Sequence, residues 1–174
     1  MRGTKLTAWR IPPIWKGLQE NNFIIPEGSS VPQNQGKMLK ATREVLTVIA
    51  GDVRGGLLET VGIESSFSMD DGRCSVVLEL PEGTDTELVA RAIDLENVEA
   101  WRDEAGKVHV GINPWYSTKD VDQTVLCTIK VIHVLLGIHA SDAEAAKPKT
   151  LKQKLLASLA EVMQIQKEVE KRKN

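Results

Sequence analysis

The residues from 61 to 137 hold the pattern that most limits how this chain can fold. Two runs of alternating apolar and polar residues are followed by a helix signal, and the same order then repeats. Apolar residues at every second position are typical of a strand with one buried face, whereas a spacing of three and four is typical of an amphipathic helix. The order ββαββα predicts an α+β domain built on a mainly antiparallel four-stranded sheet, because tight turns join consecutive strands.

The turns between the predicted strands have the composition of hairpins. Residues 61–67 are joined to residues 74–80 by Asp70-Asp71-Gly72, where aspartate and glycine accept the backbone angles of a tight turn. Residues 98–102 are joined to residues 107–112 by a second turn that ends in a glycine. Both pairs are therefore predicted to be antiparallel.

Three helices are predicted to cover this sheet. The first spans 37–50 and ends at Gly51, followed by a turn over 52–56, because glycine often adopts the left-handed backbone of a helix end. The residues expected on its apolar face are Met38, Thr42, Val45 and Ile49.

The other two helices carry recognisable caps. Thr84 and Glu87 have the spacing of a capping box, which predicts a helix to about Ile93. The residues expected on its buried face are Leu88, Ala92 and Leu95. Ser117 is the expected cap of a longer helix that stops at Gly137. The residues expected at the centre of the core are Val76, Leu78, Leu80, Val110, Val125, Ile129 and Ile132.

Segments with a different character flank this core. The predicted organisation is an extended arm over 1–36, a core domain over 37–138, a linker over 139–149 and an amphipathic helix over 150–174. Prolines interrupt the arm, yet its apolar residues need a docking site, either on the chain's own body or on another subunit. The residues predicted to form an intermolecular interface are Trp9, Trp15, Leu151, Leu155, Leu159, Val162 and Val169.

Charge is unevenly distributed along the chain. The net charge of all 174 residues is −2, but residues 37–146 have a net charge of −9 and residues 147–174 a net charge of +5. A basic segment of this kind can meet nucleic acid, an acidic protein surface or the acidic body of the same chain. The acidic body and the scarcity of interleaved aromatic and basic residues disfavour nucleic acid.

No catalytic, metal or cofactor pattern stands out. The two cysteines, Cys74 and Cys127, lie in apolar surroundings and far apart, which favours reduced core thiols over a disulfide, a metal site or a catalytic nucleophile. The glycines around Arg54 lack the lysine and hydroxyl spacing of a phosphate-binding loop. We therefore predict no catalytic residue, no metal ligand and no cofactor.

One aromatic loop is the best candidate for a binding surface on the core. Asn113, Trp115 and Tyr116 join the last predicted strand to the long helix, and Trp101 on the neighbouring hairpin is expected near them. Loops in such positions often carry binding groups. The alternative is an aromatic plug over the edge of the core.

The string from Val108 to Asp122, VHVGINPWYSTKDVD, resembles the small C-terminal domain of fold-type I pyridoxal-phosphate enzymes. The resemblance covers residues 74–137. A chain of this length has no room for the large cofactor-binding domain, so no activity is carried over.

These observations favour a non-catalytic interaction or accessory protein that self-associates. The alternative is a ligand-binding or small enzymatic domain with a pocket at the aromatic loop, and nucleic-acid binding through the basic segment is third. No run of about 20 apolar residues is present, and the N-terminus lacks the apolar centre of a secretory signal. We therefore expect a cytoplasmic protein with no membrane contact.

Overall fold

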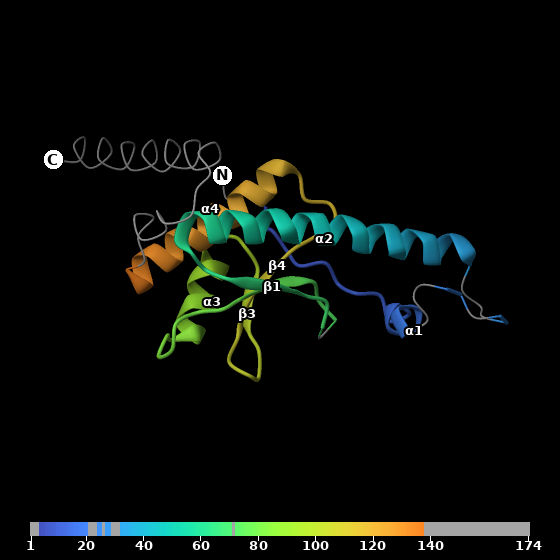
Figure 1. The fold of residues 1–174 in the computed structure, drawn as a ribbon, viewed down its shortest axis with the longest axis horizontal. Coiled ribbons are helices and arrows are strands. Elements are labelled where there is room, and N and C mark those ends of the chain that lie inside the picture. The colour runs from blue at the N-terminus through green and yellow to red at the C-terminus, as the bar shows by residue number, and fades with distance from the viewer. Residues whose placement is uncertain (1–3, 21–23, 26, 29–31, 71, 138–174) are drawn as a thin grey trace.

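The computed structural model describes residues 4–20, 24–25, 27–28, 32–70 and 72–137. Figure 1 shows how its helices and strands are arranged. In chain order they are α1 (Trp15–Glu20), α2 (Gln33–Val61), β1 (Ser65–Ser68), β2 (Ser75–Leu78), α3 (Thr86–Leu95), β3 (Ala100–Arg102), β4 (Val108–Gly111) and α4 (Thr118–Leu136).

The sheet has four strands in the order β1-β2-β4-β3, and each neighbouring pair is antiparallel. The predicted α+β fold with two hairpins is therefore confirmed. The register places Val76 opposite Val110 and Ser75 opposite Gly111. Because opposite residues in an antiparallel pair point to the same face, Val76, Leu78, Val108 and Val110 share one face of the sheet. The other face, which we call the polar face after Ser75 and His109, also carries Val77 and Gly111.

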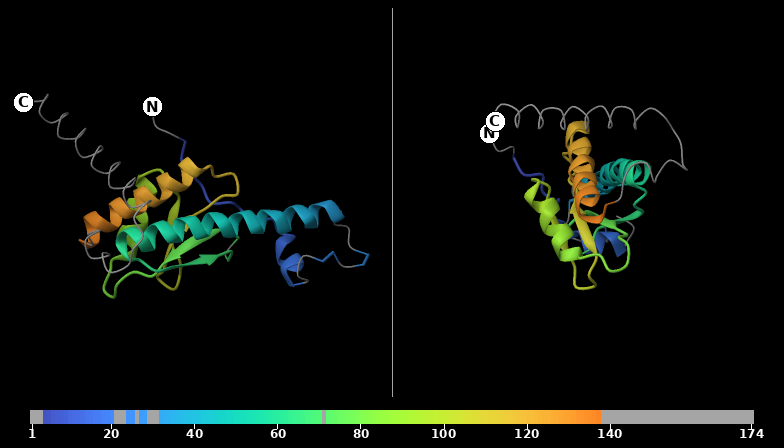
Figure 2. Two further views of the ribbon diagram at one scale, coloured as in Figure 1. Left: turned by 45° about the horizontal axis from the view of Figure 1, so that its top comes forward. Right: turned by 90° about the vertical axis from the view of Figure 1, so that its left-hand side faces the viewer.

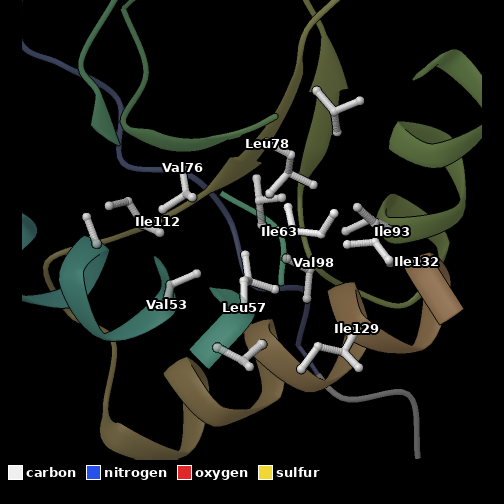
Figure 3. Packing of buried hydrophobic residues seen from close by; sticks show 14 of the residues in the cluster. Val53, Leu57, Ile63, Val76, Leu78, Ile93, Val98, Ile112, Ile129 and Ile132 are labelled. Atoms are coloured by element: carbon white, nitrogen blue, oxygen red, sulfur yellow. The ribbon is translucent and has the colours of Figure 1, made fainter. Parts of the chain in front are cut away.

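Helices α2, α3 and α4 lie on one side of the sheet (Figure 2), the side whose Val76, Leu78, Val108 and Val110 join them in the core. Side chains from these helices and from the strands meet in one aliphatic core, in which Leu57, Val76 and Ile132 are fully buried (Figure 3). Leu80 is only partly buried, because it lies two residues beyond Leu78, the last residue of β2. The other residues predicted at the centre of the core are buried: Val76, Leu78, Val110, Val125, Ile129 and Ile132.

Helix α2 is longer than predicted at both ends. It runs without interruption from Gln33 to Val61, so the predicted stop at Gly51 and the turn over 52–56 are wrong. A glycine inside a helix costs about 1 kcal/mol relative to alanine, which burial of the apolar face outweighs. The left-handed end is at Gly62 instead, with φ 68°.

The longer helix changes the first strand and the buried helix face. Val61 belongs to α2, so β1 is shorter than the predicted strand. Ile49 is buried as predicted, but Met38 and Val45 are 68% and 44% exposed. The N-terminal part of α2 extends past the sheet (Figure 2), so only the side turned towards α1 is covered there.

The cap of α4 is confirmed and the cap of α3 is corrected. Ser117 and Asp120 form a reciprocal capping box at the start of α4. The cap of α3 is Asp85, whose carboxylate accepts a hydrogen bond from the Leu88 N–H, while the Thr84 hydroxyl donates to a turn carbonyl. Leu88 and Leu95, both expected on its buried face, are 49% and 75% exposed, and Ala92 is half-buried. The buried residues of α3 are Val89, Ala90 and Ile93.

Helix α4 ends as predicted at Gly137, which has a φ of 65°. Its last turn is only partly buried: Val134 is 70% exposed and Leu135 is 37% exposed. Both follow Ile132, the last fully buried residue of the helix. The core therefore covers one side of the C-terminal part of α4 and leaves the other side open.

The described N-terminal segment packs on the chain's own body. Leu6 forms an isolated parallel bridge with Val98. The Trp9 N–H donates to the Ile112 carbonyl at 2.8 Å, and the Cys74 N–H donates to the Trp9 carbonyl at 3.1 Å. The segment therefore crosses the ends of the strands and satisfies backbone groups that the sheet leaves unpaired.

A short helix interrupts the predicted extended arm. Trp15, Leu18 of α1 and Leu39 of α2 form a second buried cluster, separate from the main core. The rings of Trp9 and Trp15 meet edge to face, with centroids 5.4 Å apart. Trp15 is 1% exposed, so it packs within the chain. The predicted interface residues Leu151, Leu155, Leu159, Val162 and Val169 lie outside the described residues.

Candidate functional site

A groove with a volume of about 560 Å³ runs along the seam between α2 and the first half of α4. The exposed acidic residues Asp52, Glu59 and Asp122 stand on its rim, and Tyr116 lies at the start of α4. None of the described residues that line it is lysine or arginine. The buried residues that form its floor are Ile49, Gly56, Val121 and Val125.

A glycine sets how closely the two helices approach at this groove. A Cβ atom placed on Gly56 would lie 2.9 Å from the Cγ1 atom of Val125, which is closer than real side chains come. Any larger residue would push α4 away from α2. Gly56 is therefore required by the packing of the core and by the depth of the groove.

Two further glycines in α2 have no such role. A Cβ atom on Gly51 or on Gly55 would meet nothing within 4 Å. They share the outward face of the helix with Val48 and Leu58, which are 63% and 51% exposed. We call these four residues the glycine row. Its spacing of three, four and three residues keeps them on one face of α2.

Three of the four predicted binding residues lie in the loop between β4 and α4. The Asn113 side-chain amide donates to the Thr7 carbonyl at 3.2 Å. The Tyr116 hydroxyl lies 3.4 Å from the carbonyls of both Thr7 and Gly111. Trp115 is 82% exposed. The loop thus fastens the N-terminal segment, and of the three side chains only Tyr116 lines the groove.

The Tyr116 phenol is a hydrogen-bond donor at neutral pH. Burial raises its pKa well above its usual range, and the nearby carboxylates of Asp120 and Glu99 raise it further. A phenol with a raised pKa keeps its proton, so Tyr116 is not suited to act as a general base.

Trp101 is placed differently from the other predicted binding residues. Its ring stacks on His109, with centroids 5.2 Å apart and planes 16° apart. The Arg73 guanidinium lies 3.8 Å from the centroid of the Trp101 ring, a cation–π contact. These contacts are on the polar face of the sheet, so the structure groups Trp101 with His109 and Arg73 instead of with the loop.

The polar face also holds a Ser–His–Asp arrangement that the sequence analysis did not identify. Ser75 Oγ lies 2.9 Å from His109 Nδ1, and His109 Nε2 lies 3.1 Å from Asp103 Oδ2. The only sequence signal was the alternation that puts Ser75 and His109 on polar strand faces. Alternation does not reveal that β2 and β4 are neighbours, which is what brings the two side chains together.

This arrangement ties strands together and does not present a nucleophile. Ser75 is 1% exposed and His109 6% exposed, and neither lines the groove. The hydrogen bond from His109 lowers the pKa of Asp103, and the Lys107 N–H lowers it further. Asp103 is therefore ionised at neutral pH and accepts both hydrogen bonds.

The cysteine thiols are held in their protonated form. Burial raises the pKa of Cys74 to about 12, and Cys74 is fully buried. Burial also raises the pKa of Cys127, and the Glu96 carboxylate adds to this effect. Since the thiolate is the nucleophilic and metal-binding form, both thiols are weakly reactive at neutral pH.

Among the residues that the structure describes, no helix combines the length and the apolar character that a membrane span needs. The same residues include no cluster of three or more histidines, cysteines or acidic residues that could hold a metal ion. Comparisons with protein-family models, curated proteins and solved structures gave no match.

Proposed function

We propose that this chain is an accessory protein that acts through protein–protein contacts and associates with a second copy of itself through α2. The observation that supports this most is the glycine row on the outward face of that helix. It combines two exposed apolar side chains with two glycines that the chain's own packing does not need.

The glycine row is complementary to itself. If two copies of α2 pair in antiparallel fashion about a two-fold axis between Gly51 and Gly55, each Gly51 faces the Gly55 of the second copy. Val48 then faces Leu58 at both ends of the contact. Symmetric dimers need such self-complementary surfaces, and glycines allow two helix backbones to approach closely.

A second copy also gives a physical reason for residues that are costly in a lone chain. Each helical glycine costs about 1 kcal/mol relative to alanine. Val48 and Leu58 leave more than half of their surface in water. Close pairing of two helices would cover the apolar side chains and use the space that the glycines leave.

Sedimentation velocity over a range of concentrations tests the proposal. The wild-type chain should show a concentration-dependent dimer, and Val48→Glu combined with Leu58→Glu should remain monomeric, because four carboxylates would then face one another. Leu95→Glu is the matched control, since Leu95 is 75% exposed on α3 and away from the glycine row. A wild-type chain that stays monomeric at every concentration would refute the proposal.

A further inference from the structure

We infer that the groove between α2 and α4 binds residues 150–171 of the same chain. This groove adjoins the glycine row at Gly51 and Gly55, but Val48 and Leu58 do not line it. The two surfaces thus share Gly51 and Gly55, but the inference rests on the rim and the floor of the groove and does not depend on the proposed dimer.

The groove and the segment are complementary in charge. The rim carries the carboxylates of Asp52, Glu59 and Asp122, and none of the described lining residues is basic. Residues 150–171 contain four basic and three acidic residues, and the flanking positions Lys147, Lys149, Arg172 and Lys173 add four basic ones. A basic segment therefore gains favourable Coulomb energy along this rim, which salt should weaken.

The two surfaces are also complementary in polarity. The floor of the groove is apolar, and among the described residues nothing fills the groove above it. The segment has a stripe of apolar residues at helical spacing with lysines beside it, the pattern that docks into an apolar groove with acidic edges. The apolar residues of this stripe are Leu151, Leu155, Leu159, Val162 and Val169.

The connection is long enough for binding within one chain. Gly137 ends α4, and Val125 on the groove floor lies twelve residues earlier in the sequence, or about 18 Å along the helix axis. The connecting residues 138–149 can span up to about 40 Å when extended. A short connection also gives the segment a high effective concentration at the groove, which favours binding in cis.

Reversing the charges on the groove and on the segment, in the full chain, tests this inference. The measurement is the rate at which thermolysin cleaves within residues 150–171. Asp52→Lys combined with Asp122→Lys should accelerate cleavage about tenfold at low salt, since it replaces attraction by repulsion. Adding Lys152→Glu and Lys154→Glu should restore most of the protection. Glu82→Lys with Glu104→Lys is the matched control, since both residues are exposed in loops that do not line the groove.

A second variant removes the apolar contact without changing the groove. Leu155→Asp with Leu159→Asp should accelerate cleavage as well, and the melting transition of the sheet should remain. Cleavage that is equally fast in the wild type and in all variants would overturn the inference. Protection that falls on dilution would also overturn it, because the segment would then come from a second copy. The solution mass, measured on the same samples, reports separately on the proposed dimer.

Discussion

Two adjacent glycines in α2 have opposite surroundings, although the sequence presents them as an identical pair. The Cβ position of Gly55 is open, whereas that of Gly56 lies 2.9 Å from Val125 Cγ1. Gly55→Ala should raise the free energy of unfolding by up to about 1 kcal/mol through helix propensity. Gly56→Ala should lower it by about 1–3 kcal/mol through overpacking against α4. Urea unfolding at a concentration that keeps the chain monomeric measures both, and shifts in the same direction would contradict the packing described.

The hydrogen bonds of Asp103 predict a pH dependence of stability. Its pKa is lowered in the folded chain, so its contribution is present above the unfolded pKa, about 3.9, and is lost as pH falls through the folded value. Asp103→Asn should therefore be less stable than the wild type at pH 7, and the difference should shrink below about pH 4. Urea unfolding at both pH values measures this. An equal difference at both would mean that the Asp103 charge does not stabilise the fold.

The roles of single capping residues were predicted correctly where one residue can cap the helix. They were predicted less well where two neighbouring residues compete for the same cap. Ser117 and Gly137 act at the ends of α4 as their sequence context predicted. Thr84 had equally good spacing, but its hydroxyl bonds the Pro81 carbonyl, and the adjacent Asp85 carboxylate caps α3. A sequence pattern cannot rank two neighbouring capping residues when a turn also uses one of them.

At the scale of elements, the N-terminal segment depends on a close backbone contact with β4. A Cβ atom on Gly111 would lie 2.8 Å from the Cβ atom of Ala8 and 3.0 Å from its backbone nitrogen. Gly111→Ala should therefore lift the segment and leave the sheet intact. The expected result is a red shift of tryptophan fluorescence, since Trp9 would lose contacts. Ser66→Ala, on the exposed part of β1, is the control, and an unchanged spectrum in Gly111→Ala would argue against this contact.

The two hairpins could be predicted from nearby residues, whereas the length of α2 could not. Both hairpins were predicted because alternation and turn residues lie within about a dozen positions of each other. The full length of α2 was not predicted, because the glycines at 51, 55 and 56 are typical of a helix end. Packing against segments far away in the sequence overrides this signal. Position 56 holds a glycine because Val125, far away in the sequence, occupies the space that a side chain would need.

At the scale of the whole molecule, the candidate site depends on how distant segments meet. The predicted binding loop lies around Trp115, and of its residues only Tyr116 lines the groove. The acidic rim was missed because Asp52 and Asp122 lie on different helices, and each alone reads as an ordinary solvated charge. Sequence spacing reports neighbours on one element, whereas a groove between two helices depends on their packing.

The central claim is that α2 pairs with itself, and cysteine cross-linking tests it most directly. In a chain with Val48→Cys and Leu58→Cys, the antiparallel pairing brings Cys side chains of two copies together at each end of the contact, within the distance that a disulfide needs. Cys74 is fully buried and should not interfere, and Cys127→Ser removes the half-buried thiol. Leu95→Cys in the same background is the control.

Mild oxidation should give a covalent dimer at twice the chain mass with the α2 pair and not with the control. A chain that stays monomeric after oxidation, or a control that cross-links equally well, would contradict the account.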